Sequence, residues 1–308
     1  HRRRWVWKRR RVWKRRSERR FNNELPAKAT LATAVMHLQY HNLMQGVLGQ
    51  PMCPGALLVG EKGTGKTAAM SCAQAFIGKK DVSAKLGVEL SLPVLSASLQ
   101  LQAGLTYVID EVATHQSLKN EQGTRLYKNL VHMCYDGTTR GVMQTDTSIG
   151  CTEPRTSFIA TANVVPLFYD PPSVERVLHI HFKPLEGGHT DGAKTVEQSA
   201  VWKATMEMMS CVMPDFAALV YNGHLDKSAI IDCCSYMNAV CGVSYQRLCN
   251  MWGFLLYYML LLEFIAMGNK DSVTHIFEWA TFECYKQYKL VAKNSTVLLK
   301  FLKAVKLL

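Results

Sequence analysis

The stretch Gly60-Glu61-Lys62-Gly63-Thr64-Gly65-Lys66-Thr67 decides the fold prediction, because it fits the pattern G-x-x-x-x-G-K-[ST] at every constrained position. Glycines reach backbone conformations that residues with a Cβ avoid, so successive N–H groups can turn inward around a β-phosphate. We expect Lys66 to neutralise the β- and γ-phosphates of ATP, and Thr67 to place its hydroxyl on Mg²⁺. The sequence therefore predicts a nucleotide-binding loop over residues 60–67.

The flanking sequence supplies the strand and helix that this motif requires. Residues 56–59 (ALLV) are a short apolar run after Pro51, Pro54 and Gly55, and they lead directly into the loop. Residues 68–77 (AAMSCAQAFI) contain good helix formers and no Pro or Gly before Gly78. The strand, loop and helix together predict a nucleotide site, and the alternative is a chance match in a flexible glycine loop.

A second buried strand is predicted at residues 105–111 (LTYVIDE), which are apolar and β-branched until two acids end the run. A buried parallel strand reads as a continuous apolar run, and its carboxyl end opens onto the crevice where ligands bind. We expect Asp110 to hold Mg²⁺ through its water shell and Glu111 to polarise the water that attacks the γ-phosphate. The alternative is an ordinary exposed acidic turn.

A third strand, residues 157–163 (SFIATAN), ends in Asn163, which could orient the attacking water or sense the γ-phosphate. Arg176 follows thirteen residues later, just before a predicted half-buried strand at 177–182 (VLHIHF). Because it follows Asn163 in a phosphate-loop protein, we interpret Arg176 as an arginine finger for a neighbouring subunit's γ-phosphate. A surface arginine is the simpler alternative.

Other segments give coarser expectations. We predict a helix at residues 27–48 and a strand at Leu92–Leu95. The apolar run 251–267 is interrupted only by Glu263 and is just short of the roughly 18 residues typical of a spanning helix. A buried helix explains this run equally well, and we expect no membrane association.

No C-x-x-C pair occurs among the ten cysteines, which favours reduced, buried thiols in an intracellular protein over zinc or disulfides.

The positive charge is concentrated at the N-terminus. The 308-residue chain has a net charge of +12, and residues 1–20 hold 12 Lys/Arg and one acid, so the remainder is nearly neutral. Tryptophans interleave with the basic residues there, and Arg9, Arg10, Arg11 and Trp13 are candidate nucleic-acid contacts. The alternatives are a solvated tail, a nuclear-import signal or a membrane-surface segment.

In their order, these motifs resemble the superfamily III helicases of the AAA+ class, which include papillomavirus, polyomavirus, parvovirus and poxvirus replication proteins. The resemblance covers residues 50–185: phosphate loop, strand ending Asp-Glu, strand ending Thr-Ala-Asn, then PPSVERVLHIHFKP at 171–184. It implies a hexameric ring, ATP between subunits and a hairpin that tracks single-stranded DNA. The matching region here is 138–156, where Arg140 and Arg155 are weak candidates for contact, although no clear Lys-His pair is present.

We therefore expect an α/β P-loop NTPase of AAA+ type with a parallel-sheet core. The expected parts are a basic Arg/Trp-rich arm at 1–25, a helical lead-in at 26–50, the ATPase core at 51–190 and a mainly helical region at 191–308. The leading hypothesis is an ATP- and Mg²⁺-dependent motor on nucleic acid, with DNA favoured, located in the nucleus or at a viral replication site. The competing hypothesis is an AAA+/STAND-like regulatory ATPase that controls protein assembly. A GTPase is disfavoured because no N-K-x-D sequence follows the acidic strand. A kinase of small substrates is disfavoured because the two acids after that strand, together with Asn163 and Arg176, suit hydrolysis.

Overall fold

The computed structural model describes most of the chain in separate ranges. They are residues 23–46, 52–78, 83–85, 92–102, 104–112, 121–137, 140–143, 149–163, 171–184, 214, 218, 226–241, 246–265 and 270–305. The basic arm, with Arg9, Arg10, Arg11 and Trp13, lies outside the described residues.

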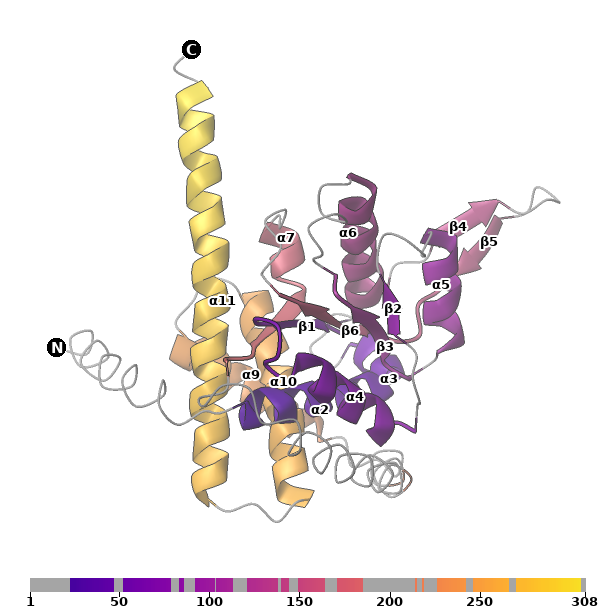
Figure 1. The fold of residues 1–308 in the computed structure, drawn as a ribbon. Coiled ribbons are helices and arrows are strands. Elements are labelled where there is room, and N and C mark those ends of the chain that lie inside the picture. Colours follow the sequence, from indigo (N-terminus) through magenta and orange to yellow (C-terminus); the bar gives the residue numbers. More distant parts are fainter. Residues whose placement is uncertain are drawn as a thin grey trace.

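A five-stranded parallel sheet forms the centre of the described part of the chain (Figure 1). Its strands are β1 (Gly55–Val59), β2 (Ser83–Lys85), β3 (Tyr107–Asp110), β6 (Phe158–Ala162) and β7 (Val177–His181), in the order β2-β3-β6-β1-β7. Neighbouring strands are all parallel. The carboxyl ends of β1, β3 and β6 therefore share one edge of the sheet, where ligands bind in open α/β folds.

Helices account for most of the remaining described structure. They are α2 (Glu24–Leu38), α3 (Tyr40–Met44), α4 (Lys66–Phe76), α5 (Leu92–Leu101), α6 (Glu121–Asp136), α7 (Pro171–Val174), α9 (Lys227–Cys241), α10 (Gln246–Ile265) and α11 (Lys270–Val305).

Two hydrophobic cores lie on opposite faces of the sheet, because side chains alternate in direction along each strand. Ala56 and Leu58 enter one core, together with residues of α2, α4, α9 and α10. Leu57 and Val59 enter the other, together with residues of α5 and α6. Both faces of the central strands are therefore buried, which explains why their sequences read as unbroken apolar runs.

The four predicted strands that flank or follow the loop are confirmed, but the prediction for Leu92–Leu95 was wrong. Residues 92–101 form the helix α5, in which Leu95, Ser96 and Leu99 are buried on one face. Pro93 lies in the first turn, where its missing N–H is not needed. Four apolar residues are too few to distinguish a strand from a helix by periodicity. The helix predicted at 27–48 is divided into α2 and α3 at Gln39, whose ψ of 12° interrupts the helical backbone.

A two-stranded antiparallel hairpin lies within the region expected from the family resemblance. It consists of β4 (Arg140–Met143) and β5 (Ile149–Thr152), with Arg140 opposite Thr152. In Figure 1 it projects beside α5, on the side of the molecule away from α11. Residues 144–148 lie outside the described ranges.

Among the described helices, α10 is the one that is long and apolar enough to cross a membrane, with a mean hydropathy of 1.6. In this structure 67% of that apolar window is buried by the rest of the protein. Glu263 near its end is 5% exposed and accepts a hydrogen bond from Lys28 Nζ at 2.9 Å. A core helix satisfies the same length and composition test, and α10 packs between α2, α9 and α11 as a core helix does.

Candidate nucleotide site

The predicted loop connects β1 to α4, and its geometry depends on glycine at three positions. Gly63 and Gly65 have φ of +83° and +91°, which is left-handed backbone that residues with a Cβ rarely adopt. Gly60 lies so close to the residue that follows β7 that a Cβ would be 2.5 Å from the carbonyl oxygen of Phe182. Because α4 begins at Lys66, the positive end of its dipole points at the loop, which suits a bound phosphate.

Lys66 lies at the centre of this loop and is 7% exposed. Its ammonium group donates hydrogen bonds to the carbonyl oxygens of Gly60 (2.6 Å) and Glu61 (2.7 Å), and a longer one to Asn163 Oδ1 (3.3 Å). Burial lowers the pKa of Lys66, and the nearby charges of Asp110 and Glu111 oppose that shift. The lysine is thus a positive charge held between the loop and two acidic residues, as binding of a polyphosphate requires.

The two acids lie at the end of β3, and Thr161 of β6 links them. The Thr161 hydroxyl donates to Asp110 Oδ1 at 2.6 Å and accepts from the Glu111 backbone N–H at 2.8 Å. Glu111 has φ of +52° and is the one non-glycine residue with positive φ in the described part of the chain. Such backbone costs on the order of 1–3 kcal/mol and concentrates at functional sites. The Thr161 contacts therefore stabilise an otherwise unfavourable turn that presents Glu111.

A pocket of about 410 Å³ joins the loop, the acids and the end of β6, within the range of natural ligand pockets. It is lined by Lys62, Gly63, Thr64, Gly65, Lys66, Thr67, Ala68, Asp110, Glu111, Thr161 and Asn163. The structure thus brings the predicted loop, both acids and Asn163 to one place. The remaining two predicted loop residues, Gly60 and Glu61, contribute the carbonyl groups that hold Lys66.

The donor atoms in this pocket also fit a magnesium ion. Thr67 and Asp110 both line it, and they offer a hydroxyl and a carboxylate. Mg²⁺ prefers oxygen ligands and keeps several waters, so one or two protein oxygens together with phosphate oxygens suffice. Asp110 Oδ1 already accepts from Thr161, which fixes the direction of the carboxylate.

The sequence did not mark two residues that shape the site, Thr161 and Asn23. Asn23 precedes α2 and donates from Nδ2 to the carbonyl oxygens of Thr64 and Lys183, each at 2.8 Å. Its Oδ1 accepts from the Lys183 N–H, also at 2.8 Å. Asn23 therefore ties the phosphate loop to the chain that leaves β7. A lone asparagine 41 residues before its partner carries no local pattern that could reveal this contact.

Arg176 does not line the pocket of its own chain. Its Nε donates to Asp136 Oδ2 at 3.2 Å, and its Nη1 donates to the carbonyl oxygen of Pro172 at 2.9 Å. The guanidinium lies 5.6 Å from the ring centre of Tyr135, and Arg247 lies 5.9 Å from the same ring. The side chain of Arg176 is 13% exposed, and its role as a finger toward a neighbouring subunit stays a prediction.

The described candidates for nucleic-acid contact lie around the hairpin. Arg140 is the first residue of β4. Arg155 follows β5 and is exposed, and its backbone bonds to Leu99 and Gly104 fix the base of the hairpin against α5. Their contact with nucleic acid remains a prediction.

Comparisons with known proteins support the fold. No protein-family model matches the chain, and no curated protein matches it. The solved structure of SCCmec type IV Cch, an active helicase, is similar with a TM-score of 0.64 at 15% sequence identity, covering 94% of this chain and 53% of that one. The present chain thus spans about half the length of that helicase. The predicted α/β P-loop NTPase fold is confirmed.

Two structures of JCV helicase also match at lower TM-scores. One contains N-(4-(2-(thiazolo[5,4-c]pyridin-2-yl)phenoxy)phenyl)acetamide and matches with a TM-score of 0.33 at 12% identity, covering 83% of this chain and 66% of that one. The other contains an inhibitor and matches with a TM-score of 0.32 at 13% identity, covering 66% and 63%.

Proposed function

We propose that this chain is an ATPase that drives a motor on nucleic acid, in the manner of a superfamily III DNA helicase. The observation that carries the proposal is the pocket in which Lys66, Asp110, Glu111 and Asn163 meet at one edge of a parallel sheet. A buried lysine beside a glycine loop suits phosphate binding, and two acids opposite it suit metal binding and water activation.

In this mechanism the loop N–H groups and Lys66 bind the β- and γ-phosphates of ATP. Mg²⁺, held by Thr67 and Asp110, would neutralise developing charge on the phosphate oxygens. Glu111 accepts a proton from the attacking water while the water oxygen bonds to the γ-phosphorus. The bond between the γ-phosphorus and the oxygen that bridges the β- and γ-phosphates breaks. The products are ADP and inorganic phosphate. Asn163, which contacts Lys66 at 3.3 Å, senses whether the γ-phosphate is present.

The first test is ATP turnover by purified protein, with Lys66→Ala as the decisive variant. We expect Lys66→Ala to lose turnover and Lys227→Ala to retain it, because Lys227 is an exposed residue at the start of α9 and does not line the pocket. Turnover by Lys66→Ala at the rate of the unmodified protein would refute the site.

We further propose that Arg176 completes the site of the next subunit in a homo-oligomeric ring, which the family resemblance implies is a hexamer. Arg176→Ala and Lys66→Ala should each be inactive alone, yet regain activity when mixed. In a head-to-tail ring with random mixing, about one interface in four pairs an intact Lys66 with an intact Arg176. Activity near that fraction supports a shared site, and a mixture as inactive as its components contradicts it.

The nucleic-acid part of the proposal rests on the basic arm, the hairpin and the helicase fold. We expect single-stranded DNA to stimulate ATP turnover, and deletion of residues 1–20 to weaken DNA binding and its dependence on salt. If DNA leaves turnover unchanged and the deletion leaves affinity unchanged, the motor proposal fails. The result would then favour an AAA+/STAND-like regulatory ATPase, whose nucleotide state controls protein assembly and whose arm serves localisation, for example to the nucleus or a viral replication site.

A further inference from the structure

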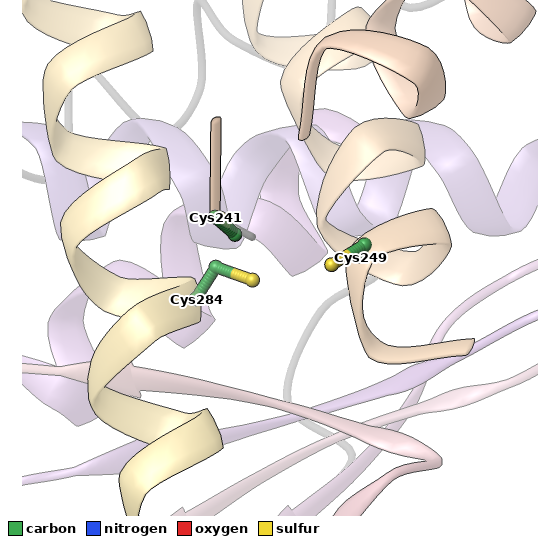
Figure 2. Close-up of side chains that lie close together, drawn as sticks. All are labelled: Cys241, Cys249 and Cys284. Atoms are coloured by element: carbon green, nitrogen blue, oxygen red, sulfur yellow. The ribbon is translucent and has the colours of Figure 1, made fainter. Parts of the chain in front are cut away.

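Three cysteines distant from the nucleotide pocket converge between the C-terminal helices. Cys241 is the last residue of α9, Cys249 lies in the first turn of α10 and Cys284 lies in α11. Their sulfur atoms all lie within 4.8 Å of one another. Figure 2 shows the side chains of Cys249 and Cys284 directed toward each other across the space between α10 and α11, with Cys241 beside them. All three residues are buried.

The surrounding contacts hold the three helices at a fixed separation. Trp252, three residues after Cys249, donates from Nε1 to Gln287 Oε1 at 3.0 Å, and Gln287 lies three residues after Cys284. Gly253 allows α10 to approach α9 so closely that a Cβ would be 2.6 Å from the Cα of Cys234. The sulfur atoms are thus brought together by buried, well-packed helices, so little chain entropy remains to be lost when they bind a common ligand.

We propose that Cys241, Cys249 and Cys284 bind a zinc ion that fastens α9, α10 and α11 together. Thiolate sulfur is a soft ligand, and sulfur-rich tetrahedral sites in proteins hold zinc or iron–sulfur clusters. Sulfurs about 2.3 Å from a tetrahedral zinc are about 3.8 Å apart, so a group within 4.8 Å needs only small side-chain adjustments to surround one ion. The cysteines supply three of the four ligands of such a site.

The burial of the three cysteines also favours a cation at their centre. Zinc binds cysteine as thiolate, and two or more thiolates buried together need a positive charge beside them. Zinc supplies that charge, and its binding releases the thiol protons.

A disulfide is the competing use of two of these thiols. A disulfide needs its two sulfurs about 2.05 Å apart and leaves the third thiol over, whereas one metal ion uses all three. Burial of the cluster also limits its contact with oxidants. The geometry and the odd number of sulfurs both favour the metal.

The experiment measures metal in the full chain, expressed without a polyhistidine tag in zinc-containing medium and dialysed. Elemental analysis should find one zinc per chain, and X-ray absorption at the zinc edge should find three sulfurs at about 2.3 Å. The triple variant Cys241→Ala/Cys249→Ala/Cys284→Ala should contain at least about tenfold less zinc per chain than the unmodified protein. Cys134→Ala, which removes a buried thiol from the other hydrophobic core, should keep it.

X-ray absorption uses the unmodified protein, so the test stands even if the triple variant fails to fold. Zinc absent from the unmodified protein, zinc with a shell of nitrogen and oxygen only, iron in place of zinc, or zinc retained in a folded triple variant would each overturn the proposal. A disulfide between any two of these cysteines, found by mass spectrometry without reduction, would overturn it as well.

Discussion

Replacing Thr161 by valine is the sharpest perturbation of the nucleotide pocket that leaves its phosphate-binding groups in place. Valine has nearly the shape of threonine but lacks the hydroxyl that donates to Asp110 and accepts from the Glu111 N–H. Thr161 is 2% exposed, so water cannot easily replace the lost partner. The substitution therefore tests whether this one side chain positions both acids.

The expected magnitude follows from these two hydrogen bonds. The 2.6 Å bond to the Asp110 carboxylate contributes about 1.5–3 kcal/mol, and the bond from the Glu111 amide contributes about 0.5–1.5 kcal/mol. Loss of both should lower the free energy of unfolding by about 2–4 kcal/mol. Since Glu111 is held at a φ of +52°, its turn should relax, and a displacement of about 1 Å costs on the order of 100-fold in turnover.

The assay compares kcat for ATP hydrolysis with the affinity for ATP measured calorimetrically. We expect Thr161→Val to lower kcat by about 100-fold while the Kd for ATP changes little, because Lys66 and the loop keep their contacts. Thr161→Ser keeps the hydroxyl and should retain most of the activity. Thr156→Val is the matched control, since Thr156 is buried near the opposite end of β6 and donates to the Leu105 carbonyl oxygen at 3.0 Å. Equal losses of kcat in the two valine variants, or normal turnover by a folded Thr161→Val, would refute the reasoning.

Three further predictions concern binding, backbone strain and pH. Asn23→Ala should weaken ATP binding by about tenfold, because the loop loses its link through Thr64; an unchanged calorimetric Kd would contradict this. Glu111→Gly should be about 1 kcal/mol more stable to urea than Glu111→Ala, because glycine relieves the positive φ, and equal stabilities would show that the turn is unstrained. Burial lowers the pKa of His37 to about 4 and of His179 to about 3. Below about pH 6.5 the unfolded chain therefore binds more protons than the folded chain. Each histidine should then lower the free energy of unfolding by about 1.4 kcal/mol per pH unit, until the pH reaches its folded pKa. Urea titrations at pH 6.5 and 5.5 measure that loss, which His37→Gln should reduce by about half.

The features predicted correctly from the sequence are those encoded by neighbouring residues. The glycine loop, the strand before it, the helix after it and the strand that ends at Asp110 each lie within one short segment. A buried parallel strand also reads as an apolar run whichever strands lie beside it. The run at Leu92–Leu95 was misassigned because four apolar residues suit a strand or a helix, and the buried face of α5 continues to Leu99, beyond the predicted segment.

The features missed from the sequence depend on how segments far apart in the chain pack together. Thr161 meets Asp110 only because β6 lies beside β3 in the sheet, and the two residues are 51 positions apart. Asn23 meets Lys183 across 160 positions. The cysteine cluster has the same origin, since it forms where three helices pack and its spacing matches no local metal motif. Such sites require the register and packing that only the folded chain defines.

Residues 181–183, at the end of β7 and just after it, contact both the predicted nucleotide loop and helix α11. These contacts connect the parallel-sheet core to the helices that follow it in the chain. Asn23 fixes the loop to Lys183, and the preceding residue, Phe182, donates its N–H to the Val59 carbonyl oxygen at 2.7 Å. One residue earlier, His181 bonds through Nδ1 to Glu283 of α11 at 2.7 Å. Glu283 is 2% exposed and directly precedes Cys284 of the proposed zinc site. Because these bonds are short and link the phosphate loop through residues 181–183 to α11, a shift of the loop must either strain them or move α11 with it. Helix α11 is therefore mechanically coupled to the P-loop core, although no catalytic motif marks it in the sequence.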